Sequence, residues 1–162
     1  MDGVEIPPRA LVVLIGPSGS GKSTAAARRF RPMEIVSSDR CRALVADDEN
    51  DQSATRAAFR VLHALVEERM RLGRLAVVDA TNLHRPDRRP LLERAVRFGR
   101  PKVAVVFDEP LRVCLERNRG RGERVLPDHV IRRQHPLLSA ALEQVPDEGF
   151  DRVYLLGSAG HQ

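Results

Sequence analysis

Residues 10–23 read ALVVLIGPSGSGKS, and this stretch decides the fold of the chain. Six apolar residues come first, as expected for a strand buried on both faces of a parallel sheet. The segment 16–23 then matches G-x-x-x-x-G-K-[ST] at every fixed position, and an alanine-rich segment over residues 22–30 follows as the expected helix. A strand, a glycine-rich loop and a helix in this order predict a phosphate-binding P-loop.

The chemistry of such a loop depends on its backbone. Glycines let several N–H groups point inward at a phosphate, and the positive end of the following helix adds to that field. We expect Lys22 to reach the β- and γ-phosphates of ATP, and the Ser23 hydroxyl to be a ligand of Mg²⁺. The expected ATP-binding residues of the loop are Gly16, Ser18, Gly19, Ser20, Gly21, Lys22, Ser23 and Thr24.

Outward from this loop, strand and helix patterns alternate. Short apolar runs predict further strands at residues 34–37, 75–78, 103–107 and 153–156. Apolar spacing, prolines and glycines predict helices at residues 54–72, 86–98, 111–117 and 127–145, with Ser53 as the cap of the first of these. The pattern predicts an α/β protein of the P-loop NTPase or kinase type, with a five-stranded parallel sheet and helices on both faces.

Length and composition narrow the class of protein. The 162 residues fit a single P-loop kinase domain, 1–162, with a core of about residues 10–157 and loose ends at 1–8 and 158–162. A formal net charge of +5 suits an anionic partner, either a nucleotide or a nucleic acid. The longest apolar runs are far shorter than the roughly 20 residues that cross a bilayer, and the first residues do not resemble a signal peptide. We therefore expect no membrane partner and a cytoplasmic location.

The second predicted strand leads directly into Asp39 and Arg42. Ligands of parallel α/β folds bind at the carboxyl ends of the strands, so Asp39 should face the P-loop. A carboxylate there can accept the proton of an attacking hydroxyl, and Arg42 can hold a phosphate of the acceptor. The alternative is that Asp39 caps a helix and that Arg42 is a solvated side chain.

A further acid, Asp79, ends the third predicted strand in the run VVDATN. This position suits an aspartate that holds Mg²⁺ through water. An ordinary capping role at the end of the strand is the alternative.

Four arginines lie within residues 117–124 and alternate with glycine. Guanidinium groups near a γ-phosphate stabilise the charge that spreads over its oxygens during transfer, and glycines let a loop close over it. We interpret residues 117–126 as an arginine-rich lid, because small P-loop kinases keep a lid after the fourth strand. An exposed basic turn is the alternative.

Taken together, these stretches resemble the 5′-OH polynucleotide kinase domain of bacterial RNA-repair enzymes that join kinase, phosphatase and ligase modules. The resemblance spans roughly residues 11–156. It rests on GPSGSGKST (16–24), EIVSSDRCRALVADDENDQ (34–52), VVDATN (77–82), VAVVFDEP (103–110) and VCLERNRGR (113–121). The second run discriminates best, since generic P-loop kinases share only the first.

The resemblance implies a role for each matching residue. Asp39 would be the general base, and Arg42 and Gln52 would bind the acceptor. Asp79 would lie in the water shell of the metal. The lid arginines Arg117 and Arg121, with Arg124 as a third, would bind ATP; Lys22, Asp39, Arg117 and Arg121 form the expected catalytic set.

The expected function is therefore ATP-dependent transfer of the γ-phosphate to the 5′-OH end of RNA or DNA. The phosphatase and ligase modules of the family are not part of this sequence, and would belong to a longer protein or to separate chains. A P-loop kinase that acts on a nucleoside-like small molecule is the nearest alternative. A nucleotide-dependent switch or ATPase is a third, and it predicts a water-positioning Gln or Glu near the γ-phosphate.

Overall fold

The computed structural model describes residue 1 and residues 3–157, with the backbone only for residue 123. Its sheet has five strands, all parallel, in the order β2-β3-β1-β4-β5. The strands are β1 (Leu11–Ile15), β2 (Ile35–Ser37), β3 (Ala76–Asp79), β4 (Lys102–Phe107) and β5 (Arg152–Leu156). The expected α/β fold with a five-stranded parallel sheet is thus confirmed.

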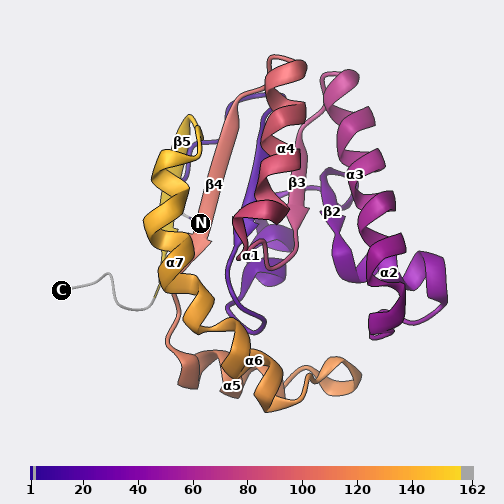
Figure 1. The fold of residues 1–162 in the computed structure, drawn as a ribbon, viewed down its shortest axis with the longest axis vertical. Coiled ribbons are helices and arrows are strands. Elements are labelled where there is room, and N and C mark those ends of the chain that lie inside the picture. The colour runs from indigo at the N-terminus through magenta and orange to yellow at the C-terminus, as the bar shows by residue number, and fades with distance from the viewer. Residues whose placement is uncertain (2, 158–162) are drawn as a thin grey trace.

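Helices cover both faces of this sheet (Figure 1). They are α1 (Lys22–Arg29), α2 (Ser38–Ala46), α3 (Thr55–Arg71), α4 (Arg85–Arg97), α5 (Leu111–Arg119), α6 (Asp128–Gln134) and α7 (Pro136–Gln144). Short 3₁₀ turns lie at Pro32–Glu34, Gln52–Ala54, Gly122–Arg124 and Val145–Asp147. Among the described residues, no helix is both long and apolar enough to cross a membrane.

The central strand β1 shows why the sheet needs two covering layers. Alternate side chains of a strand point to opposite faces. Leu11, Val13 and Ile15 pack in one buried cluster with α3, α4 and α7, whereas Val12 and Leu14 pack in the other with α1. Every residue of β1 is fully buried, which is why its sequence is continuously apolar instead of alternating.

Three expectations about helices were wrong. The segment predicted as one helix over 127–145 is two, α6 and α7, because Pro136 has no N–H to donate to the helical ladder. Ser53 does not cap α3: it lies in the preceding 3₁₀ turn, where Asp51 accepts from its backbone N–H. The helix expected to end at Arg117, α5, continues to Arg119, so the first residues of the segment interpreted as a lid are helical.

The N-terminal segment is also less loose than expected. Val4 is buried in the cluster beneath α1, and the Arg29 guanidinium donates to its carbonyl. Glu5 pairs with Arg152 of β5. The predicted loose end at 158–162 lies outside the described residues.

Residues that follow β3 hold the start of the P-loop by hydrogen bonds. Thr81 accepts a hydrogen bond from the Gly16 N–H (2.9 Å), and the Asn82 side chain donates to the Leu14 carbonyl (2.7 Å). Asn82 is buried and has a left-handed backbone (φ 48°), a conformation that Asn tolerates better than most residues. These hydrogen bonds join the loops after β1 and β3 at the carboxyl edge of the sheet.

Candidate active site

The P-loop connects β1 to α1 and packs against α5. At Gly19 (φ 81°), a Cβ atom would lie 2.2 Å from the Cys114 carbonyl oxygen, so only glycine fits there. The loop is therefore clamped between the sheet and α5, and its shape is set before any ligand binds.

The Lys22 side chain folds back over the loop. Its Nζ donates to the carbonyls of Gly16 and Pro17, both at 2.8 Å. Burial lowers the pKa of Lys22 to about 8; Asp79 raises it and Arg121 lowers it further. The ammonium group thus lies in a dry environment at the position where phosphates of a P-loop ligand would compensate its charge.

Asp79 ends β3 next to the start of α1. Its side chain is buried, and burial raises its pKa, while Lys22 and a hydrogen bond from the Ser23 side chain lower it. The lysine, the serine hydroxyl and the carboxylate therefore form one compact group. This arrangement brings together the three side chains expected around the phosphates and the metal.

Asp39 and Arg42 lie on the first turns of α2. Ser37, not Asp39, caps this helix, because the Ser37 hydroxyl accepts from the Arg40 N–H. Arg42 is buried, not solvated, and its Nη1 donates to Asp39 (2.9 Å) and to the Glu49 carbonyl (2.8 Å). Both alternatives considered for this pair are therefore wrong, and Asp39 is oriented by a buried guanidinium.

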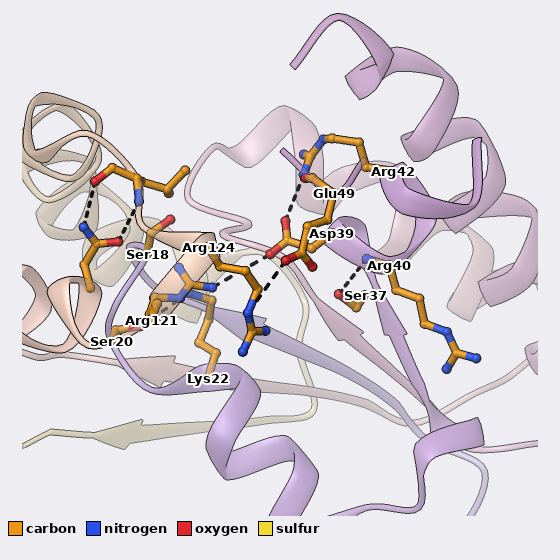
Figure 2. A network of polar contacts seen from close by, with 12 residues as sticks. Ser18, Ser20, Lys22, Ser37, Asp39, Arg40, Arg42, Glu49, Arg121 and Arg124 are labelled. Atoms are coloured by element: carbon orange, nitrogen blue, oxygen red, sulfur yellow. Dashed lines mark hydrogen bonds and ion pairs between the residues drawn. The ribbon is translucent and has the colours of Figure 1, made fainter. Parts of the chain in front are cut away.

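The arginine-rich segment faces this pair (Figure 2). Arg121 lies 3.9 Å from the Asp39 carboxylate, and Arg124 lies 3.7 Å from Glu49. Arg117, on the last turn of α5, instead contacts the P-loop, donating to the Ser20 carbonyl (3.3 Å), and pairs with Glu109. The three arginines thus connect α5 and its following loop to both the P-loop and α2.

The base of that loop is held by Asn118. This side chain is fully buried, donates to the Leu126 carbonyl (2.8 Å) and accepts from the Leu126 N–H (3.0 Å). The intervening residues 119–125 project from this closed base. Nothing in the sequence distinguished Asn118 from its arginine neighbours.

Residues of the P-loop, of α2 and of the arginine-rich segment line one cleft of about 1660 Å³. Thirteen of the predicted site residues contribute: Ser18, Gly19, Gly21, Lys22, Ser23, Thr24, Asp39, Arg42, Gln52, Asp79, Arg117, Arg121 and Arg124. Gly16, the first residue of the loop, lines neither this cleft nor the second hollow, of about 870 Å³, which Ser20 lines together with Gly21, Thr24 and Arg117. The structure therefore brings the predicted set together around the P-loop.

The cleft has further polar residues that sequence reasoning missed. The Gln134 side chain of α6 accepts a hydrogen bond from the Ser18 N–H, 116 residues away in sequence. Thr55 lines the same cleft as Arg42, and the Thr55 Oγ1 and Arg42 Nε atoms are buried without hydrogen-bond partners among the described residues. Seven cationic side chains and four carboxylates line the cleft, which favours an anionic ligand.

Comparisons with known proteins agree with this fold. A family model described as an AAA domain matches residues 11–141. A structure of the Pnkp1/Rnl/Hen1 RNA repair complex aligns with a TM-score of 0.71 and 21% identity, over 88% of this chain and 48% of that one. A putative kinase from Chloroflexus aurantiacus aligns with a TM-score of 0.63 and 16% identity, over 96% and 88% of the two chains.

A third structure contains a nucleotide. The APS kinase CysC of Mycobacterium tuberculosis, in complex with AMPPNP and APS, aligns with a TM-score of 0.52 and 26% identity over 72% of each chain. A search of curated protein sequences gave no match. The chain spans about half the length of the RNA-repair chain it resembles. The fold is thus that of P-loop kinases, which implies binding of an ATP-like nucleotide and supports a phosphotransferase.

Proposed function

The chain belongs to the AAA domain family, and from this premise we propose that it is an ATP-dependent polynucleotide 5′-hydroxyl kinase. The observation that carries the proposal is the pair formed by Asp39 and Arg42 across the cleft from the P-loop. A partly exposed carboxylate is available to a hydroxyl, and a buried guanidinium beside it has an Nε–H without a partner among the described residues. That combination suits a hydroxyl that neighbours a phosphate.

The donor half of the site is the P-loop. Its backbone N–H groups and Lys22 would bind the β- and γ-phosphates of ATP. Because Lys22 is buried and its ammonium bonds only to loop carbonyls and Ser20 among the described residues, incoming phosphates would add counter-charge to that of Asp79.

The transfer step needs a base and charge stabilisation. The hydroxyl oxygen of the acceptor attacks the γ-phosphorus while Asp39 accepts the hydroxyl proton. The bond between the γ-phosphorus and the bridging oxygen breaks, and ADP leaves with that oxygen. Arg121, which lies near Asp39, and Arg117, which lies on the P-loop, neutralise charge on the transferred group. Arg124, the third arginine of the proposed lid, would also bind the phosphates of ATP.

Ser23 and Asp79 fit a magnesium site. Mg²⁺ prefers oxygen ligands and keeps several waters, so it needs few protein side chains. The Ser23 hydroxyl and Asp79 carboxylate already contact one another beside the P-loop, and no group of three or more His, Cys, Asp or Glu among the described residues offers a competing site. Ser23 would bind the ion directly and Asp79 through water; the ion would neutralise charge on the β- and γ-phosphate oxygens.

The acceptor half of the site supports a nucleic acid. Arg42 would bind the phosphate next to the reacting hydroxyl, with Gln52, which lines the same cleft, as a second contact to the acceptor. The positive balance of the cleft suits a polyanion, and one structural relative comes from an RNA repair complex. Partnership with phosphatase and ligase modules, in the same or separate chains, is part of this proposal.

Label transfer from γ-labelled ATP tests the proposal. The acceptors are RNA and DNA oligomers with 5′-OH ends, the same oligomers with 5′-phosphates, 3′-nucleoside monophosphates, free nucleosides and none. We expect label on the 5′-OH oligomers only, and its loss in Asp39→Asn. Label on a nucleoside alone would indicate a small-molecule kinase, and label released only as phosphate would indicate an ATPase; either result would rule out the polynucleotide kinase.

A further inference from the structure

One backbone N–H of the P-loop is occupied by a side chain from a distant helix. The Gln134 carboxamide, at the end of α6, accepts a hydrogen bond from the Ser18 N–H at 2.8 Å. Next to it, His135 contacts the Glu109 carbonyl just before α5 (2.9 Å). The N–H groups of a P-loop are the donors that bind phosphate oxygens. Gln134 therefore occupies a donor of the phosphate site itself.

The position of Ser18 within the loop indicates which phosphate would meet this N–H. Ser18 lines the large cleft together with Asp39 and Asp79, and it is absent from the second hollow. Ser20 lines only the second hollow, and Gly21 lines both. Ser18 thus lies at the acceptor end of the loop. A nucleoside triphosphate bound with its transferable phosphate toward Asp39 brings that phosphate, and not the β-phosphate, to the Ser18 N–H.

We infer that Gln134 is a specificity-determining residue for the donor, because its Oε1 competes with the γ-phosphate for the Ser18 N–H. A triphosphate must displace the carboxamide, whereas a diphosphate leaves it in place. Gln134 therefore lowers the affinity for ATP relative to ADP, and its displacement reports the γ-phosphate to α6 and the lid base. This inference rests on the nucleotide site of the proposed function and does not depend on the identity of the acceptor.

Two substitutions at this position have opposite expected effects. Gln134→Ala removes the competitor, so binding of a triphosphate should tighten about 2- to 10-fold, the range of one ordinary hydrogen bond. Gln134→Glu accepts the same hydrogen bond with a charged oxygen and repels the γ-phosphate. Triphosphate binding should then weaken by at least about 10-fold. In both variants the change in ADP affinity should be several-fold smaller.

Calorimetric titration of the whole chain tests the inference. The probes are ADP and a non-hydrolysable ATP analogue, each with Mg²⁺ and without acceptor. Arg132→Ala is the matched control, because Arg132 is an exposed neighbour on α6 that lines neither hollow. It should change neither affinity. Thermal melting of each variant checks that α6 is intact.

The pattern of affinities decides the result. Opposite shifts for the triphosphate analogue in Gln134→Ala and Gln134→Glu, with ADP little changed, would support the inference. Equal changes for both nucleotides, or no change in either variant, would overturn it while leaving the proposed kinase standing. Failure of the unaltered chain to bind either nucleotide would overturn both the inference and the donor site of the proposed function.

Discussion

The Arg42 guanidinium holds the Asp39 carboxylate at 2.9 Å although the two side chains differ sharply in exposure. Arg42 is 9% exposed at its side chain and Asp39 is 46% exposed. They are three residues apart on α2, so one helical turn fixes their geometry. A buried charge must be paired, and Asp39 is that partner. The carboxylate is thus fixed from behind and open to the cleft in front, as a base that receives a proton from a ligand must be.

Substitution of Asp39 tests this arrangement. In Asp39→Asn, phosphoryl transfer to the acceptor should fall at least about 100-fold, because the amide cannot accept the proton of the hydroxyl. ATP binding should change much less, since among the described residues Asp39 makes no hydrogen bond or ion pair with the P-loop and acts on Lys22 only through a weak electrostatic interaction. Label transfer and calorimetry measure the two effects. Asp47→Asn, at the C-cap of the same helix and away from the cleft, is the control; comparable loss there would contradict the role of Asp39.

Arg42 should act on acceptor binding. Arg42→Lys keeps a positive charge but loses the planar fork and the Nε–H that has no partner among the described residues. The acceptor KM should rise roughly 10-fold, with little change in the KM for ATP. Steady-state kinetics with varied oligomer measure this split. Arg40→Lys is exposed on α2 and lines neither hollow, so it should behave as the unaltered protein. An equal rise in both KM values would argue against an acceptor role.

Two arginines of the segment 117–124 provide a test variant and its control, Arg121→Ala and Arg119→Ala. Arg121→Ala removes a guanidinium 3.9 Å from Asp39, and kcat should fall by about 100- to 1000-fold because a donor to the transferred phosphoryl group is lost. Arg119→Ala removes an exposed arginine that pairs with Asp128 outside the cleft. Single-turnover transfer rates should separate the two variants. Similar rates for both would mean that the segment contributes only general positive charge.

The sequence predicted the layout of the site well, for a definite reason. Asp79 ends β3 and Asp39 comes just after β2, and the carboxyl ends of parallel strands meet at one edge of the sheet. Their placement at the sheet edge that carries Lys22 could therefore be inferred from the predicted parallel sheet and the P-loop motif. Rules of this kind predict which residues share an edge of the sheet, and in the structure Lys22, Asp39 and Asp79 line one cleft.

Gln134 and Asn118 could not be found in this way. Their partners lie in other elements or across a turn, and a lone Gln or Asn in a helix carries no local signal of a contact made after folding. The extent of α5 was misjudged because arginine and asparagine next to glycine suggest a loop, yet α5 continues to Arg119 with its inner face packed on the P-loop. Tertiary packing overrode the weak local preference.

Gly19 tests how tightly the P-loop is clamped. Gly19→Ala should destabilise the protein by at least about 3 kcal/mol, because the methyl group meets the Cys114 carbonyl in addition to backbone strain at φ 81°. Gly149→Ala has a similar φ of 88° but open space around its Cβ, and should lose only about 1–2 kcal/mol. Urea unfolding measures both. Equal losses would show that α5 does not pack on the loop as described.

Lys22 should give the protein a distinctive dependence of stability on pH. Its pKa is lowered from 10.5 to about 8, chiefly by burial. Below pH 8 the lysine is charged in both the folded and unfolded states, and folding must bury that charge. Between pH 8 and 10.5 the unfolded state binds more protons, so the free energy of unfolding rises with pH.

Methionine does not titrate, so a comparison with Lys22→Met isolates the contribution of the Lys22 side chain to the pH dependence. Between pH 7 and pH 9.5, the free energy of unfolding of the unaltered protein should rise relative to Lys22→Met by about 2 kcal/mol, since one pKa unit corresponds to about 1.4 kcal/mol. Groups that titrate in both proteins cancel in this difference, which urea unfolding at the two pH values measures. A bound nucleotide should reduce the effect, because phosphates stabilise the charged lysine and raise its pKa. A difference that stays flat with pH would mean that water reaches Lys22 and that the P-loop is not the dry, preformed site from which the donor half of the mechanism follows.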